Sequence, residues 1–460
     1  MTLRLRFADG AIVLRGEGSQ RLRDAVETGD GDVPADALSL TVDDRSETLR
    51  APAHRYADLR DALDAAGLDY EDRVFDPHSL PLATDYDLRD YQSAALDAWE
   101  ANDRRGVLEL PTGSGKTVVA VAAMAALGAP TLVVVPTVDL LTQWRRELET
   151  EFGVDVGQLG GGEQRVEDVT VATYDSAYLR ADDIGDRFEF VVFDEVHHLG
   201  AEGYRDIARL LAAPARLGLT ATFERPDGAH DVIEELVGPV VYERTVDDLA
   251  GEHLADYELR RIEVDLTDAE REAYEAAQGT FVDYLKTSGL SFSSGSDYQE
   301  LVMRSGSDPR AREALLAKQE AREIMMNADA KVDALARLLD RHRDDRVIVF
   351  TAHTDLVYRL SERFLLPAIT GETGASERRS ILDRFREGTY SRIVTANVLD
   401  EGIDVPDANV AVVLSGSGSE REFTQRLGRV LRPKSDGGRA LLYEVVSAET
   451  AEERVAERRR

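Results

Sequence analysis

The sequence predicts an α/β protein with two doubly wound parallel sheets, a helical insert between them and a small α+β domain at the N-terminus. Three observations support this class. Short apolar runs alternate with helical patterns from residue 87 to about 245, the alternation returns after residue 346, and a charged, helix-rich stretch separates the two regions. Such runs are typical of parallel strands buried on both faces of a sheet. A chain of 460 residues is long enough for about three domains.

The first region, residues 1–84, opens with a hairpin pattern. Apolar and arginine residues alternate from Leu3 to Phe7, Asp9-Gly10 supplies a turn, and Ala11 to Leu14 is apolar again. A helical pattern follows near Tyr56 to Ala66. No catalytic constellation appears in this region, so we expect a small folded domain without chemistry of its own.

The two sheet domains are predicted at residues 85–250 and 341–460, with the insert at 251–340. Their expected strands are 131–135, 169–172, 190–193, 216–219, 346–350, 391–395, 410–414 and 440–443. The insert contains a flexible, serine-rich stretch at 288–296 and restarts at Asp308-Pro309, a favourable helix N-terminus.

The composition excludes several classes of protein. The chain has no cysteine, which removes disulfides, thiolate zinc sites and thiol nucleophiles. It has no run of 18 apolar residues and no signal-peptide pattern at its start, so we expect a cytoplasmic protein that does not bind membranes.

The net charge is −33, and only five residues are lysine, leaving 50 of the 55 basic residues as arginine. Excess acid with little lysine resembles the proteomes of halophilic archaea, in which concentrated salt screens self-repulsion. On this interpretation the acidity reflects habitat and permits a nucleic-acid partner. The alternative is an acidic protein that avoids DNA, because phosphate binding ordinarily depends on basic patches.

A phosphate-binding loop is predicted at Leu110 to Thr117. A strand, a glycine-rich turn, Lys-Thr and a helical run from Val118 to Leu127 together form an anion site. Lys116 would reach the β- and γ-phosphates of ATP, and the Thr117 hydroxyl would ligate Mg²⁺. The candidate contacts in this loop are Thr112, Gly113, Ser114, Gly115, Lys116 and Thr117. Leucine stands at position 110, where the strict pattern has glycine.

An acidic box follows the strand at 190–193. Asp194 would hold Mg²⁺ through water, and Glu195 would polarise the attacking water. His197 and His198 also suggest a metal site, but metal ligands usually need i, i+4 spacing or distant partners. The favoured interpretation is that His197 couples the ATP site to the turn containing Thr220 and Thr222.

A second group of basic residues lies 310 positions after the loop, in Gln425 to Arg432. Arg429 and Arg432 are spaced i, i+3 on a predicted helix, so both face one side. From across a cleft they would stabilise the charge on a transferring γ-phosphate. The alternative is a pair of surface ion pairs on an acidic protein.

Taken in order, these motifs resemble superfamily 2 helicases with an Asp-Glu-Val-His box, closest to archaeal XPB-type DNA helicases, over residues 88 to about 446. The resemblance implies two RecA-like domains, with ATP and Mg²⁺ as cofactors. Leu88 to Gln92 resembles the segment that reads adenine, which implicates Arg89 and Gln92. Val398 to Pro406 is similar to the family's fifth motif and adds Gly402 and Asp404. The sixth motif adds Gln425 as a coupling residue.

The grip on nucleic acid is expected from threonines at strand ends or loop starts in helicase-like motifs. They are Thr137, Thr173, Thr351, Thr370 and Thr395. Hydroxyls contact phosphate without net charge, which suits binding in high salt, although threonines at such places are also common caps. The family's Arg-Glu-Asp element for duplex opening reads Arg225-Pro226-Asp227 here, so proline replaces the glutamate and removes its carboxylate, which predicts weaker strand opening unless Glu224 substitutes.

We therefore expect an ATP-dependent DNA helicase or translocase, with 3′ to 5′ polarity and a role in nucleotide excision repair or transcription implied by the resemblance. A DNA junction is the expected substrate, a structure-specific nuclease is a plausible partner by resemblance, and the protein is expected to be a monomer. Two alternatives are a DEAD/DEAH-like RNA helicase and a non-catalytic ATP-binding repair adaptor. By position, the insert resembles the family's DNA-gripping thumb or is a structural bridge, and residues 1–84 occupy the place of its damage-recognition domain.

Overall fold

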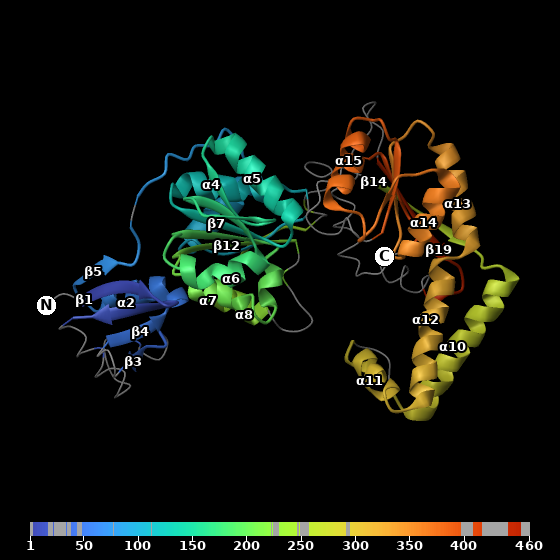
Figure 1. The fold of residues 1–460 in the computed structure, drawn as a ribbon, viewed down its shortest axis with the longest axis horizontal. Helices are drawn as coiled ribbons and strands as arrows, with labels where there is room; N and C mark the ends of the chain where they lie inside the picture. The colour runs from blue at the N-terminus through green and yellow to red at the C-terminus, as the bar shows by residue number, and fades with distance from the viewer. Residues whose placement is uncertain are drawn as a thin grey trace. The chain divides into compact units, whose positions relative to one another are not determined.

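The computed structural model describes most of the chain. The described residues are 3–16, 22, 34, 38–43, 48–76, 78–111, 113–221, 223, 230–245, 248, 257–290, 295–396, 408–415 and 440–451. They fall into two compact units (Figure 1). The first comprises Met1–Leu254 with Glu401–Ile403, and the second comprises Ala255–Asp400 with Asp404–Arg460.

The N-terminal domain contains a five-stranded sheet in the order β3-β4-β2-β1-β5, with helix α2 packed against it. Its elements are β1 (Leu3–Ala8), β2 (Ala11–Arg15), β3 (Thr41–Asp43), β4 (Thr48–Pro52), the 3-10 helix η1 (Ala53–Arg55), α2 (Tyr56–Ala65) and β5 (Tyr70–Arg73). The predicted hairpin is confirmed, because β1 pairs antiparallel with β2 around Asp9 and Gly10, which both have positive φ. The predicted helix is confirmed as α2.

This small domain packs closely on the rest of its unit. A Cβ on Gly185 would lie only 2.1 Å from the Phe7 ring, so glycine is required there. Ala212, from the larger domain, is part of the core of the small one. Arg55 in η1 forms an ion pair with Glu235 at 2.9 Å. The two domains of the first unit therefore share a continuous apolar and ionic interface.

The larger domain of the first unit is an eight-stranded sheet in the order β13-β6-β12-β11-β7-β10-β8-β9. Its strands are β6 (Arg105–Glu109), β7 (Thr131–Val135), β8 (Val156–Gly160), β9 (Glu163–Arg165), β10 (Val169–Thr173), β11 (Phe190–Asp194), β12 (Ala215–Thr220) and β13 (Val240–Glu243). All neighbouring pairs are parallel except β8 with β9. The predicted parallel sheet is confirmed.

Helices cover both faces of this sheet, as a doubly wound fold requires (Figure 1). One layer consists of α3 (Asp90–Ala101), α4 (Lys116–Leu127) and α5 (Val138–Phe152). The other consists of α6 (Tyr174–Ile184), η2 (Val196–Gly200), α7 (Arg205–Leu210) and α8 (His230–Leu236). Alternate residues of each strand enter the two cores. Val133 packs under the first layer and Val134 under the second.

The second unit contains a six-stranded, all-parallel sheet in the order β14-β19-β18-β15-β17-β16. Its elements are β14 (Tyr257–Val264), α13 (Asp329–Arg341), β15 (Val347–Phe350), α14 (Thr354–Phe364), β16 (Ala368–Ile369), α15 (Ala375–Arg386), β17 (Arg392–Thr395), β18 (Val410–Val413) and β19 (Ala440–Ser447). The second predicted parallel sheet is confirmed. Strand β14 was not predicted. It lies at the sheet edge and carries charged residues such as Arg260, so its sequence lacks the continuous apolar run that marks a buried strand.

Between β14 and α13, three helices form the insert: α10 (Asp268–Ser288), α11 (Gly295–Ser305) and α12 (Pro309–Met326). Helix α10 begins with a capping box between Thr267 and Glu270. Helix α12 begins at the predicted position, with the Asp308 side chain accepting from the Arg310 amide and proline in the first turn. Small side chains such as Ala317 and Ala321 let α12 pack along α10.

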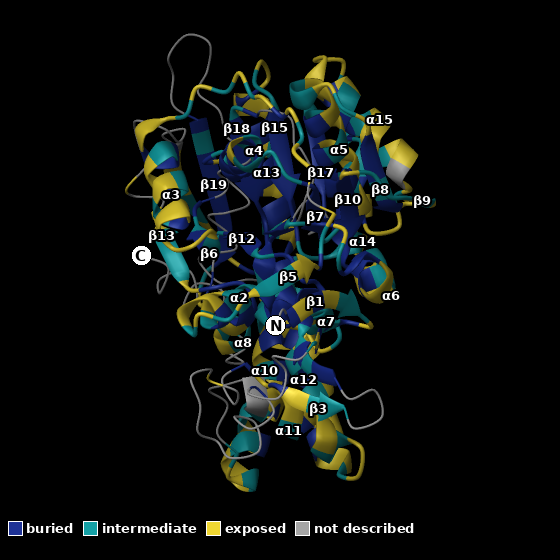
Figure 2. Cartoon of the chain, turned by 90° about the vertical axis from the view of Figure 1, so that its left-hand side faces the viewer, coloured by how far each residue is buried: buried dark blue, intermediate teal, exposed yellow. Residues whose placement is uncertain are grey.

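Burial follows this architecture: the interior strands of both large sheets are buried, while the edge strands β9, β13 and β14 and the outer faces of the helices carry exposed residues (Figure 2). Among the residues that the structure describes, no helix combines the length and apolar character needed to cross a bilayer.

Candidate functional site

Five predicted site segments meet at one edge of the first large sheet. Strands β6, β12, β11, β7 and β10 are parallel neighbours, so their carboxyl ends share that edge. The phosphate loop follows β6, Thr220 ends β12, Asp194 ends β11, Thr137 follows β7 and Thr173 ends β10. Ligands of open α/β sheets bind at the carboxyl ends of their strands. This edge is therefore the candidate site.

The phosphate loop has the backbone that an anion site needs. Gly115 has a φ of 82° and caps the N-terminus of α4, and a Cβ there would lie 2.5 Å from Nε2 of Gln92. Lys116 is 9% exposed, and its Nζ donates to the carbonyls of Leu110 at 3.0 Å and Pro111 at 3.4 Å. The ammonium group therefore lies within the loop.

The predicted adenine-reading residues lie against this loop. Arg89 caps α3, where its backbone amide donates to Oε1 of Gln92 at 3.0 Å. Nε2 of Gln92 donates to the carbonyls of Ser114 at 2.9 Å and Gly115 at 3.4 Å, and the Tyr91 hydroxyl also donates to Ser114. Gln92 is therefore a structural support of the loop in addition to its predicted role.

The Asp194 carboxylate is held from two sides. Oδ2 accepts from the indole Nε1 of Trp144 at 2.8 Å, and Oδ1 accepts from the backbone amide of Glu195 at 3.0 Å. The hydroxyl of Tyr174 donates to the Asp194 backbone carbonyl at 3.1 Å. Burial, followed by the charges of Asp194 and Glu195, raises the pKa of Tyr174 well above 10, so this hydroxyl keeps its proton. Asp194 thus has a fixed orientation.

Glu195, His197 and Thr220 lie together at this edge. Glu195 is 7% exposed and adopts a left-handed backbone, with a φ of 49°, where β11 leaves the sheet. Nδ1 of His197 is 3.6 Å from Oε2 of Glu195 and 3.2 Å from Oγ1 of Thr220. His197 therefore connects the acidic box to the turn after β12. Among the described residues, no group of three or more His, Asp or Glu side chains has the arrangement of a metal site.

Two predicted DNA-contact residues are helix caps at the same edge. The Thr137 hydroxyl accepts from the Leu140 amide at 3.2 Å and caps α5, and the Thr173 hydroxyl accepts from the Ser176 amide at 3.3 Å and caps α6. The Gly160–Gly162 turn, which sequence reasoning missed, lies beside both: a Cβ on Gly160 would be 3.0 Å from Oγ1 of Thr173, and one on Gly161 would be 3.0 Å from the Val138 side chain at the start of α5. The sequence feature that could have revealed this turn is the run of three consecutive glycines at the end of a strand.

The three predicted DNA-contact threonines of the second unit are buried. The Thr351 hydroxyl lies 2.9 Å from that of Ser415, the Thr370 hydroxyl lies 3.2 Å from that of Tyr358, and the Thr395 hydroxyl donates to the Ala396 carbonyl at 2.6 Å. Each therefore stabilises the carboxyl edge of its own sheet. Their contact with nucleic acid stays a prediction.

Several predicted site residues lie outside the described part of the chain. They are Thr112, Thr222, Arg225, Gly402, Asp404, Gln425, Arg429 and Arg432. Their roles stay predictions.

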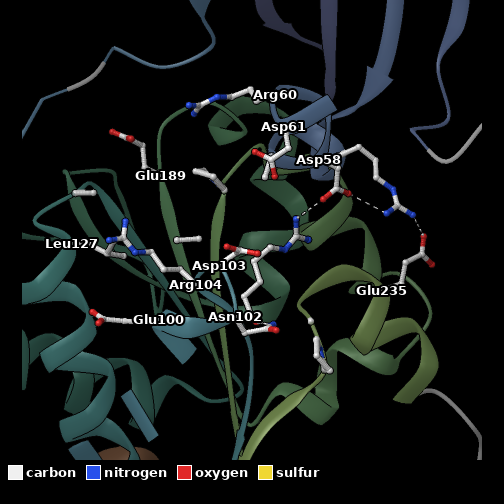
Figure 3. Close-up of a pocket in the computed structure, with 18 of the residues that line it drawn as sticks. Asp58, Arg60, Asp61, Glu100, Asn102, Asp103, Arg104, Leu127, Glu189 and Glu235 are labelled. Carbon is white, nitrogen blue, oxygen red and sulfur yellow. Dashed lines mark hydrogen bonds and ion pairs between the residues drawn. The ribbon is translucent and has the colours of Figure 1, made fainter. Parts of the chain in front are cut away.

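A hollow of about 780 Å³ lies at the opposite edge of the same sheet, against the N-terminal domain (Figure 3). Asp58 and Asp61 of α2 lie across it from Arg104, in the turn after α3. Asp58 lies 3.7 Å from Arg105 and 3.2 Å from Arg55. The hollow is a charged junction between the two domains and contains none of the predicted site residues.

These features define a P-loop ATPase of the helicase type. The structure is similar to the crystal structure of the Pyrococcus furiosus Hef helicase domain, with a TM-score of 0.53 at 20% identity over 81% of this chain and 98% of that one. Three family models match: the damage recognition domain of the xeroderma pigmentosum group B helicase at residues 5–74, the res subunit of type III restriction enzymes at 85–225, and the ERCC3/RAD25/XPB C-terminal helicase at 312–460.

Similarity to curated proteins fixes the family. The chain is 43% identical over 92% of its length to the "DNA 3'-5' translocase XPB2" of Sulfurisphaera tokodaii, of which the match covers 96%. It is 33% identical over 86% of its length to the "DNA 3'-5' helicase XPB" of Mycobacterium tuberculosis, with 67% of that protein covered. The chain belongs to the XPB family of superfamily 2 helicases, which confirms the resemblance found in the sequence.

Proposed function

We propose that this protein is an ATP-dependent DNA translocase and helicase that moves 3′ to 5′, the activity named for its relatives in Sulfurisphaera tokodaii and Mycobacterium tuberculosis. The observation that carries the proposal is the joining of Glu195 to Thr220 through His197 at the sheet edge that also holds the phosphate loop. This arrangement supports a water-activating role for Glu195 at the proposed triphosphate site and its connection, through His197, to the end of β12.

In this proposal, Lys116 and the loop amides bind the triphosphate, while Thr117 and Asp194 hold Mg²⁺. The donor set fits: Mg²⁺ prefers oxygen ligands and keeps several of its waters, and Asp194 presents a carboxylate fixed by Trp144 and the Glu195 amide. When bound, Mg²⁺ would neutralise charge on the transferring phosphate. Glu195 orients and deprotonates the attacking water.

Arg429 and Arg432 are proposed to complete the site from the second unit, which would make hydrolysis depend on domain closure. Closure and opening would then shift the DNA-contacting surfaces relative to one another and move the protein along DNA.

For the DNA grip on the first unit, we propose the N-termini of α5 and α6 together with the Gly160–Gly162 turn. Helix N-termini bind phosphate without a basic side chain. This feature suits a chain with a net charge of −33, because a contact made by backbone amides releases fewer counterions and resists salt better than one made by lysine. We also propose that the protein is a monomer from a halophilic organism. It would act with a nuclease partner in repair or transcription.

The decisive variant is Glu195→Gln. It should reduce the kcat of DNA-stimulated ATP hydrolysis by at least about a hundredfold, a typical contribution of a general base, while the Kd for ATP stays within about twofold. Glu189→Gln is the matched control, because Glu189 directly precedes β11 and Glu195 directly follows it. Undiminished hydrolysis by Glu195→Gln would contradict the assignment.

A further inference from the structure

One buried positive charge in the second unit lies outside the recognised motifs. Lys331, in the first turn of α13, is 0% exposed. Its Nζ donates to the backbone carbonyl of Leu414 at 2.6 Å. Leu414 is buried and directly follows β18, an interior strand of the sheet. The ammonium group therefore binds the chain at the point where it leaves this strand.

The same exit point is held by the neighbouring strand. The Leu414 amide donates to the Phe350 carbonyl at 2.9 Å. The Ser415 hydroxyl accepts from the Ala352 amide at 2.8 Å and lies 2.9 Å from the hydroxyl of Thr351. The start of α13 and the end of β15 thus fix two consecutive residues of the departing chain.

Packing alone does not account for a lysine here. Burying an ammonium group is costly, and an apolar side chain of similar volume is usually as stable or more stable in a core. This chain also uses arginine for nearly all of its basic residues. Its fully buried guanidinium, Arg216, donates to four carbonyls, those of Ala213, Ala208, Leu236 and Leu211. At position 331 the buried basic residue is instead a lysine, whose compact ammonium group donates to the Leu414 carbonyl at the end of β18.

The segment that begins after Ser415 contains Arg429 and Arg432. We propose that Lys331 is a positioning residue for ATP hydrolysis: it fixes the exit of the chain from β18 and so sets where this arginine-bearing segment starts. The inference rests on the proposed function. An error of about 1 Å in the placement of a catalytic group can reduce a rate by about a hundredfold. A fixed exit therefore has a kinetic role that is separate from its contribution to stability.

The test is Lys331→Met, which removes the charge and keeps an unbranched side chain. We expect the kcat of DNA-stimulated ATP hydrolysis to fall by at least about tenfold. The Kd for ATP should change by less than about twofold, because the phosphate loop belongs to the first unit. The melting temperature should change little, because the loss of a buried charge offsets the loss of the hydrogen bond to the Leu414 carbonyl. Ser415→Ala removes the hydroxyl that binds the Ala352 amide at the same exit, and it should also lower kcat, by a smaller factor. This second variant tests the proposal if Lys331→Met does not fold.

Arg343→Met is the matched control, because this basic residue lies just beyond the C-terminus of α13 and its side chain is 71% exposed. It should change none of the three quantities. Normal kcat in Lys331→Met, or a kcat that falls only in proportion to the folded fraction, would overturn the positioning role. The proposed function would fail by a different result, namely ATP hydrolysis by the unaltered protein that does not respond to DNA. The two failures are therefore distinguishable.

Discussion

The indole of Trp144 donates a 2.8 Å hydrogen bond to the carboxylate of Asp194, and both side chains are buried. Trp144 is on α5, whose N-terminus is capped by Thr137, a proposed DNA-contact residue. Asp194 ends β11 and is the proposed Mg²⁺ residue. One hydrogen bond therefore joins the helix proposed to bind DNA to the carboxylate proposed to bind the metal. Movement of α5 on DNA would then shift the Asp194 carboxylate in the ATP site.

Trp144→Phe should weaken this connection. A hydrogen bond to a charged group contributes about 1.5–3 kcal/mol, so we expect the kcat of DNA-stimulated hydrolysis to fall by about tenfold or more, together with a higher Mg²⁺ requirement. Hydrolysis rates measured across a Mg²⁺ titration give both quantities. Trp99→Phe is the control, because that indole donates at 2.9 Å to the Arg216 carbonyl, at the opposite end of β12. An equal loss in both variants would point to a general packing defect.

Gln92→Ala should weaken ATP binding for a reason separate from base recognition. The variant removes the donor to the Ser114 and Gly115 carbonyls, so the phosphate loop loses a support as well as a contact to adenine. If support dominates, the Kd values for ATP and GTP should rise by similar factors, about tenfold for a lost hydrogen bond of about 1 kcal/mol plus an unsatisfied carbonyl. Equilibrium binding of both nucleotides distinguishes the two roles, because loss confined to ATP would indicate adenine reading alone.

His54 makes the N-terminal interface sensitive to acid. Burial, followed by the charges of Arg216 and Arg55, lowers the pKa of His54 from 6.5 to about 4. The unfolded chain binds this proton at a higher pH than the folded one, so stability is fully present above pH 6.5 and is lost as the pH falls toward 4. The loss is on the order of 3 kcal/mol.

His54→Gln should therefore flatten the stability profile between pH 6.5 and about 4, measured by denaturant unfolding at constant salt. The exposed His78 provides the control. A backbone contact at Asp76 and the Asp168 carboxylate raise its pKa, so its small contribution has the opposite sign and is lost as the pH rises. A profile that keeps its full acid slope in His54→Gln would show that other groups, such as carboxylates, cause the transition.

Salt dependence follows from the net charge of −33. Self-repulsion destabilises the compact state, and concentrated salt screens it. We expect the melting temperature to rise steadily between dilute buffer and molar KCl, with hydrolysis detectable only in the upper part of that range. Full stability and activity in dilute buffer would contradict the halophilic interpretation.

Much of the fold could be predicted because its signals are local. Buried runs such as 131–135 and the Asp308-Pro309 helix start are visible within a few residues, and the structure has both. The edge strand β14 was missed because its charged residues resemble those of a surface helix, and only its pairing with β19 makes it a strand.

The candidate site divides in the same way. Lys116 and Glu195 are recognisable because their chemistry requires a fixed sequence pattern. The supports of these residues are not: Trp144 meets Asp194 across 50 positions of chain, and Lys331 meets Leu414 across 83. Such contacts depend on how the layers pack, which the order of residues does not show.

The most direct test of the account is the steady-state ATP hydrolysis rate in concentrated KCl with single-stranded DNA, duplex DNA or RNA, alongside Glu195→Gln. The account predicts that DNA raises kcat by at least about tenfold through domain closure, that RNA of the same length does so far less, and that Glu195→Gln abolishes the response. Equal stimulation by RNA and DNA would favour an RNA helicase, and a rate that ignores every nucleic acid would contradict the central claim.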